Sequence, residues 1–244
     1  MPYPRILGPE FIKLRRRRLV PLFLLIYVFW IITISFEAAT RPGYLEAGSY
    51  AAIDDLWEVL GNFPGLAIAV SVLAVISSEH FYGTVRINLL AGYTKSEFIV
   101  AKLSISLLIA GFLLLLTQAV VVIVATVWLG TSPLMLVQSA YEVPFRMIGA
   151  IGFASLGFVV GIVVVHPAAA MASLFIYILL VERLIRDAVM HLVWFPDGLG
   201  AILPMETSAM LIGGDAGLAL AFTGGSWAAI MVIVAGKVSM LRSD

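Results

Sequence analysis

The chain has 244 residues, of which 61% are hydrophobic and 12% are charged, and its mean hydropathy is +1.06. This composition excludes an ordinary soluble domain and favours a membrane protein, although the formal net charge of zero indicates nothing about partners. The length accommodates about six membrane crossings of about 20 residues each, and no sizeable soluble domain. Cysteine is absent, which excludes disulfides, thiolate metal sites and cysteine nucleophiles.

Residues 1–18 combine apolar side chains with a cluster of cations and predict an amphipathic helix at the membrane surface. The cations that would face anionic lipid headgroups are Lys13, Arg15, Arg16, Arg17 and Arg18. The same run also fits a plain positive-inside signal, and we do not expect it to bind nucleic acid. The following apolar run, from Leu19 to about Ala39, is longer than the core of a signal peptide, so we expect it to stay as the first span.

Five further apolar runs predict the remaining spans, and prolines and glycines lie at or near their ends. They are about Leu60 to Ser77, Leu103 to Leu129, Phe145 to Val165, Ala168 to Leu184 and Ala216 to Gly236. The predicted fold class is therefore all-α: a polytopic membrane protein with six transmembrane helices and an N-terminal interfacial helix. At His166-Pro167 the connection is so short that a tight turn and a re-entrant pair of helices both remain open.

The distribution of charge predicts the orientation. With the N-terminus inside, eleven cations and four carboxylates lie on the inner side, and four cations and eleven carboxylates lie outside. Because Lys and Arg accumulate on the cytoplasmic side, both termini and residues 78–101 are expected in the cytoplasm. Arg146 is assigned to the outer boundary on this reading.

Residues 78–101 are a polar segment between strongly apolar runs, and they carry the most specific pattern in the chain. In order, the pattern comprises Glu79, Gly83, Thr84, Arg86, Leu89, Leu90, Thr94, Lys95, Phe98, Ile99 and, just beyond the segment, Lys102. This order and spacing resemble the cytoplasmic segment between the second and third spans of ABC-2 (type V) ABC transporter permeases. Two departures are an Ala91-Gly92-Tyr93 turn and a lysine at position 95, where arginine is commoner in that family.

The resemblance implies that residues 1–244 form a single transmembrane permease domain, with short non-spanning outer helices within 185–215. It also implies that Glu79, Gly83, Thr84, Arg86, Leu89, Leu90, Lys95 and Lys102 couple the chain to a partner ABC ATPase. The partner would bind ATP and Mg²⁺, this chain would hold no cofactor, and a second permease copy or a related permease would complete the assembly. The expected protein is a dimeric, multi-pass subunit of the plasma (inner) membrane. The expected cargo of export is hydrophobic or amphipathic: a peptide antibiotic, a drug or a lipid-like molecule, as in peptide-antibiotic resistance and immunity.

The residues of the segment suit coupling on physical grounds also. A docking helix needs charges to set its register, apolar side chains to fill a groove, and a sharp turn, for which Gly83 and Gly92 are permissive. An ordinary cytoplasmic loop would also contain charge and glycine, but it would not require this order of residues.

The sequence contains no P-loop, since Thr94-Lys95-Ser96 lacks the preceding glycine, so we do not expect this chain to hydrolyse ATP by that route. Two other functions stay open: an intramembrane enzyme that uses His191 and outer carboxylates, and a structural or sensory membrane subunit without ATP-driven flux. His80 beside Glu79 lacks a second close ligand, so no metal site is expected.

Three polar or small-residue features of the spans have structural explanations that compete with functional ones. Glu182 and Arg186 are four residues apart and can pair at a membrane boundary. Glycines of the fourth span, from Gly149 to Gly161, permit close helix approach. Thr117, Gln118 and Thr126 in the third span either line a substrate path or form hydrogen bonds between helices.

Overall fold

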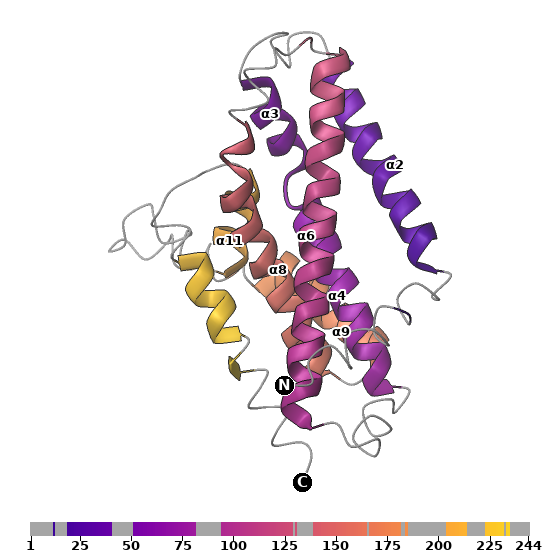
Figure 1. Ribbon diagram of the computed structural model, residues 1–244, viewed down its shortest axis with the longest axis vertical. Helices are drawn as coiled ribbons and strands as arrows, with labels where there is room; N and C mark the ends of the chain where they lie inside the picture. The colour runs from indigo at the N-terminus through magenta and orange to yellow at the C-terminus, as the bar shows by residue number, and fades with distance from the viewer. Residues whose placement is uncertain are drawn as a thin grey trace.

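The computed structural model describes residues 12, 19–40, 51–81, 94–128, 130, 139–164, 166–181, 184, 204–213, 223–231 and 233–234. Within these ranges the chain is all-helical, with no strand, which confirms the all-α prediction for the part described. The helices pack as a bundle along the long helix α6 (Lys95–Trp128), as Figure 1 shows. α4 ends and α6 begins at the lower end of this view, and α3 lies at the upper end.

The first helix, α2 (Leu19–Thr40), has 22 residues and confirms the expected first span. Its apolar residues occur on all sides, and the structure divides them between two environments. Tyr27 and Ile31 are buried against the bundle, whereas Leu25 and Phe29 are exposed. Exposed apolar side chains of this size are the expected outer surface of a helix surrounded by lipid.

A short helix, α3 (Ala51–Leu60), follows, and the sequence analysis did not predict it. The count of charges places the acidic residues of this range on the outer side of the membrane. The apolar residues between them recur with helical spacing. Its apolar face buries Ile53, Leu56, Trp57 and Leu60, while Glu58 on the other face is exposed.

The next helix, α4 (Phe63–Phe81), starts three residues later than the predicted span and ends four residues later. Gly61 separates α3 from α4 and has a φ of +52°, a conformation that glycine adopts without steric cost. Asn62 then accepts the first helical hydrogen bond of α4 from the backbone N–H of Leu66, at 2.9 Å.

The 34 residues of α6 make it about 51 Å long at 1.5 Å per residue, against about 30 Å for the hydrocarbon layer of a bilayer. Thr94 and Glu97 cap its start reciprocally. The Glu97 carboxylate accepts hydrogen bonds from the Thr94 backbone N–H (2.8 Å) and hydroxyl (2.9 Å), and the Thr94 hydroxyl accepts one from the Glu97 N–H (3.3 Å). The helix therefore starts eight residues before the predicted span, within the polar segment 78–101.

The helix α8 (Val143–Val163) confirms the fourth predicted span and its close approach to neighbours. A side-chain carbon at Gly157 would overlap with the carbonyl group of Ala69 in α4, and one at Gly152 would overlap with Ser208. Ser208 belongs to α11 (Pro204–Gly213), which lies within the range expected to hold short outer helices. Glycine thus allows α8 to contact α4 and α11 at nearly backbone distance.

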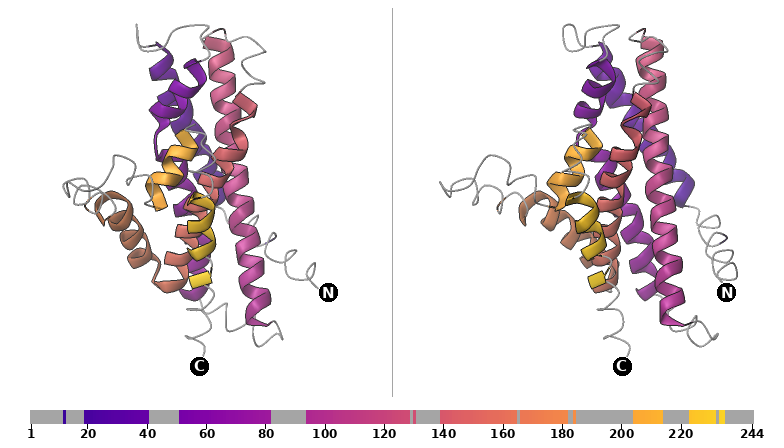
Figure 2. Two further views of the ribbon diagram at one scale, coloured as in Figure 1. Left: turned by 90° about the vertical axis from the view of Figure 1, so that its left-hand side faces the viewer. Right: turned by 60° about the vertical axis from the view of Figure 1, so that its left-hand side comes forward.

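Only residues 164–166 connect α8 to α9 (Pro167–Ile176), which continues as the π-helix η1 (Tyr177–Val181). Pro167 suits the first turn of α9, since its missing N–H is not needed there. Figure 2 shows α9 turning back from the lower end of α8 and leaning away from the other helices.

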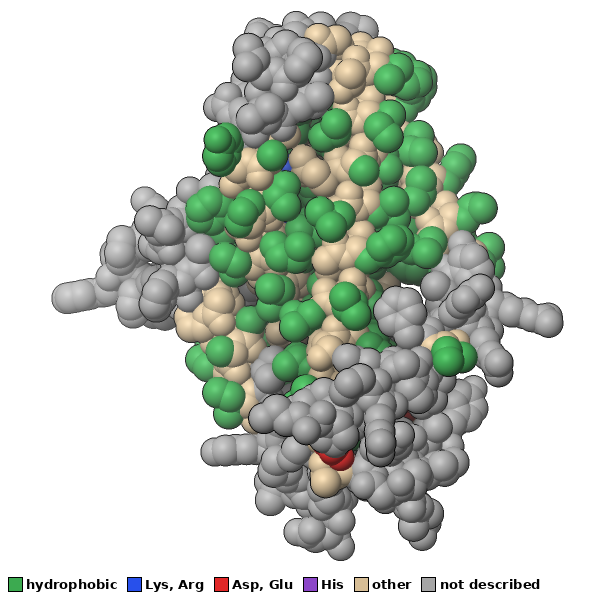
Figure 3. Space-filling view, in the orientation of Figure 1, with side chains coloured by type: hydrophobic (Ala, Val, Ile, Leu, Met, Phe, Trp, Pro, Cys, Tyr) green, Lys and Arg blue, Asp and Glu red, His purple; other side chains and the backbone are tan. Residues whose placement is uncertain are grey.

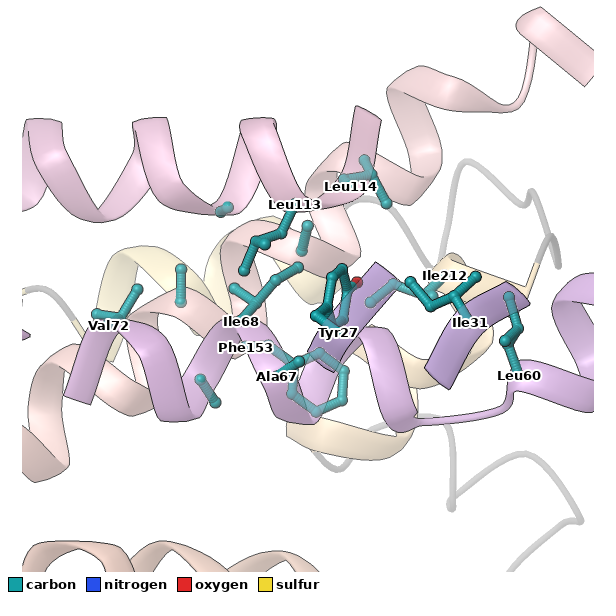
Figure 4. Close-up of a cluster of buried hydrophobic side chains, with 14 of the residues drawn as sticks. Tyr27, Ile31, Leu60, Ala67, Ile68, Val72, Leu113, Leu114, Phe153 and Ile212 are labelled. Carbon is teal, nitrogen blue, oxygen red and sulfur yellow. The ribbon is translucent and has the colours of Figure 1, made fainter. Parts of the chain in front are cut away.

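The core lies where these helices meet. Figure 4 shows Tyr27 of α2 near Ile68 of α4, Leu113 of α6 and Phe153 of α8, and Ile31 of α2 near Leu60 and Ile212. Outside this core, green apolar side chains cover much of the described surface in Figure 3, with blue and red confined to small spots.

Three of the described helices are long and apolar enough to cross a membrane: Leu22–Thr40, Glu97–Trp128 and Val143–Val163. Phe63–Glu79 and Pro167–Val181 are shorter apolar helices. Residues 223–231 and 233–234 are helical and lie within the predicted last span. The protein is thus a helical membrane protein, while the count of six spans stays a prediction.

Candidate functional site

A buried ion pair joins the end of α4 to the first part of α6. The Glu79 Oε1 atom lies 2.6 Å from the Lys102 Nζ atom, and the two residues are only 3% and 1% exposed. The Lys102 ammonium also lies 5.4 Å from the centroid of the Phe98 ring, one turn earlier in α6. Since each charge is removed from water, each depends on the other for its stability.

This pair brings together the first and last residues of the pattern in the polar segment. It lies near the lower end of the bundle in Figure 1, where α4 ends and α6 begins. Because both side chains are almost fully buried, their charges face each other and not the surface of the protein. Any part that Glu79 and Lys102 play in coupling would therefore be to position the two helices, and that part stays a prediction.

Most other predicted site residues lie outside the described residues. These are Gly83, Thr84, Arg86, Leu89 and Leu90 of the segment, and Lys13, Arg15, Arg16, Arg17 and Arg18 of the N-terminal cluster. Lys95 is the first residue of α6. Glu182, Arg186 and His191 also lie outside the described residues.

A second polar cluster surrounds Arg146, in the first turn of α8. Arg146 is completely buried (0% exposed) within the protein, and its predicted position outside or at the outer boundary of the membrane stays a prediction. Its Nη2 pairs with the carboxylate of Glu142, one turn earlier, and its Nη1 donates to the Gln118 Oε1 atom of α6 at 3.0 Å. The guanidinium carbon lies 4.5 Å from the centroid of the Trp57 ring of α3, a cation–π contact.

The amide oxygen of Gln118 also accepts a hydrogen bond from the indole Nε1 of Trp57, at 3.1 Å. One acceptor in α6 thus receives donors from both α3 and α8. The preceding residue, Thr117, shares a 2.6 Å hydrogen bond with the Tyr27 hydroxyl of α2. The two neighbouring polar residues of α6 therefore connect it to three other helices.

These contacts show the structural part of the two interpretations left open for the polar residues of the third span, while the substrate path stays a prediction. Thr117 and Gln118 form hydrogen bonds between helices, as the structural interpretation required. Thr126 donates to the Val122 carbonyl of its own helix, at 2.7 Å.

The Arg146 cluster was not predicted, although the sequence contains one indication of it. Glu142 and Arg146 are four residues apart, and an arginine within an otherwise apolar span is a functional candidate by default. The part played by Trp57 was not predictable, because it depends on α3 and on the way α3 packs against α6 and α8.

Both clusters can fix helices relative to one another, and each combines charges of opposite sign. Among the described residues, no group of three or more His, Asp or Glu side chains is placed to hold a metal ion. Comparison with known proteins finds no matching family and no matching curated protein.

Proposed function

We propose that this chain is the membrane-spanning subunit of an ATP-driven transporter of the ABC-2 kind, and that residues 78–101 contact the partner ATPase. The observation that carries the proposal is the buried Glu79–Lys102 pair. A segment that receives force from an ATPase must be attached rigidly to the helices that it moves. The pair can provide this attachment, because it joins the last turn of α4 to α6 about two turns after α6 begins.

The length of α6 supports the same proposal. At about 51 Å it exceeds the hydrocarbon thickness, so a continuous helix can carry a displacement from the polar segment into the membrane. Its start is fixed by the reciprocal Thr94–Glu97 cap. Rigid-body movement of packed helices is a common way to transmit such a displacement.

The proposed assembly has two ATPase subunits and two permease copies, or one copy with a related permease. It belongs in the plasma (inner) membrane, with both termini of this chain in the cytoplasm. Its cargo is hydrophobic or amphipathic and moves outward, which fits apolar spans that contain few charges. The ATPase subunits supply ATP and Mg²⁺ binding.

The test is co-expression of the full tagged chain with ABC ATPase subunits of its own organism, followed by purification through the tag. We expect one ATPase subunit to co-purify and to hydrolyse ATP in the complex. Arg86→Ala, in the polar segment, should reduce co-purification or ATP turnover. Thr126→Val, on an exposed face of α6, is the matched control and should leave both unchanged.

Size-exclusion profiles of the chain alone establish that both variants are folded. Absence of any ATPase partner would contradict the proposal and favour the enzyme or structural alternatives. An equal effect of Arg86→Ala and Thr126→Val would contradict the assignment of the docking segment.

A further inference from the structure

The helix α3 occupies the end of the bundle opposite to the Glu79–Lys102 pair, as the views in Figure 1 and Figure 2 agree. Its apolar side chains pack into the core, with Ile53 and Leu56 almost fully buried. Its acidic face, with Glu58 exposed, is suited to contact with water. Thus α3 packs against the side of the helical bundle near one end.

Two polar contacts of α3 come from Trp57, which is completely buried. Its indole N–H donates to Gln118 at 3.1 Å, and its ring faces the Arg146 guanidinium at 4.5 Å. Hydrogen bonds and cation–π contacts depend strongly on geometry, so they favour one position of α3 over slightly displaced ones.

A buried charge is an expensive way to hold helices together. Apolar side chains of similar volume are often as stabilising as a buried ion pair, so Arg146 and Glu142 are poorly explained by stability alone. The close contacts of α8 with α4, by contrast, use glycine and backbone atoms. The same helix therefore has an apolar contact with α4 and a polar, directional contact with α3.

We propose that Arg146, Gln118 and Trp57 form a latch that keeps α3 closed over α6 and α8. When Arg146 and Gln118 release the Trp57 ring, α3 turns away from the bundle, and the Gly61–Asn62 connection to α4 is its hinge. Gly61 suits a hinge, because its φ of +52° already lies outside the helical region. The latch stands on these contacts alone and does not require the proposed transport function.

The absence of native cysteine allows a direct test, because a thiol reagent then reports only on an introduced residue. The reporter is Ile53→Cys, since Ile53 lies on the buried face of α3 and is 1% exposed. The control reporter is Ala154→Cys in α8, where Ala154 is also 1% exposed. The full chain in detergent is treated with a water-soluble maleimide, and the rate of labelling is measured.

In the Arg146→Met background we expect labelling at position 53 to rise about threefold to thirtyfold, the effect of losing a buried cation–π contact with Trp57. Trp57→Phe keeps an aromatic ring but removes the indole donor, and should raise labelling about two- to tenfold. Labelling at position 154 should not change in either background.

If Arg146→Met raises labelling at both positions, the variant has loosened the whole bundle. The Trp57→Phe variant then distinguishes an opened latch from a loosened bundle. An increase confined to position 53 in that background supports the latch. Unchanged labelling at position 53 in Trp57→Phe, with position 154 protected, would overturn it.

Discussion

Lys102 and Glu79 are each buried in an apolar bundle, and each is stabilised by the opposite charge 2.6 Å away. Removal of one partner leaves an uncompensated charge away from water, whereas replacement of both removes the need for pairing. The two kinds of variant should therefore behave differently, and this difference distinguishes a true buried pair from a chance contact.

We expect Glu79→Gln or Lys102→Met alone to lower the free energy of unfolding by about 3 to 5 kcal/mol. The double variant should lose clearly less than the sum of the two single losses, because no charge remains buried. Unfolding of the full chain with increasing SDS in mixed micelles measures all three. Strictly additive losses would show that the two side chains do not interact.

Among the elements, α8 depends most on the absence of side chains. A Cβ at Gly157 would overlap with the carbonyl group of Ala69, and neither backbone can move without displacing its whole helix. Gly225, in the helical residues 223–231, has no atom within 4 Å of the corresponding position. Substitution by alanine therefore adds the same methyl group at a crowded site, Gly157, and at an open site, Gly225.

Gly157→Ala should destabilise the protein by about 1 to 3 kcal/mol through overpacking. Gly225→Ala should be neutral or stabilise by about 0.4 to 1 kcal/mol, because alanine restricts the unfolded chain. The midpoint of thermal unfolding in detergent compares them. Equal midpoints for the two variants would contradict the close α4–α8 contact.

The elements differ in how far the sequence predicted them, and the reasons are physical. Long apolar runs predicted α2, α6 and α8, because a helix that spans a membrane must be apolar over most of its length. The amphipathic α3 was missed, since its acidic residues occupy one helical face and were read as an outer boundary. The start of α6 was placed too late, because its first three residues, Lys95 to Glu97, are polar and Lys102 interrupts the apolar run that follows.

The sequence predicted which residues form the candidate site better than it predicted how they contact one another. Residue order singled out Glu79 and Lys102, but their contact depends on how α4 packs against α6, which no local pattern specifies. The glycines of α8 predicted close packing without indicating its partners, α4 and α11. The burial of Arg146 was not predicted, because the count of charges considers the sides of the membrane and not the packing of the helices.

At the scale of the whole molecule, two polar clusters lie toward opposite ends of an apolar bundle. The Glu79–Lys102 pair fixes α4 to α6 beside the proposed docking segment, and the Arg146 cluster holds α3 at the other end. Continuous packing along α6, α4 and α8 connects the two ends. If both proposals hold, ATP-driven movement at one end reaches α3 at the other.

The central claim is that residues 78–101 contact an ATPase, and site-specific photo-crosslinking in the co-expressed complex tests it most directly. A benzophenone amino acid is placed at Leu89 in the segment, and in a control chain at Ile123, which is exposed on the apolar surface of α6. We predict a crosslinked product that contains the ATPase subunit from position 89 and none from position 123. A complex that forms yet gives no ATPase crosslink at position 89, or gives equal crosslinking at both positions, would contradict the account.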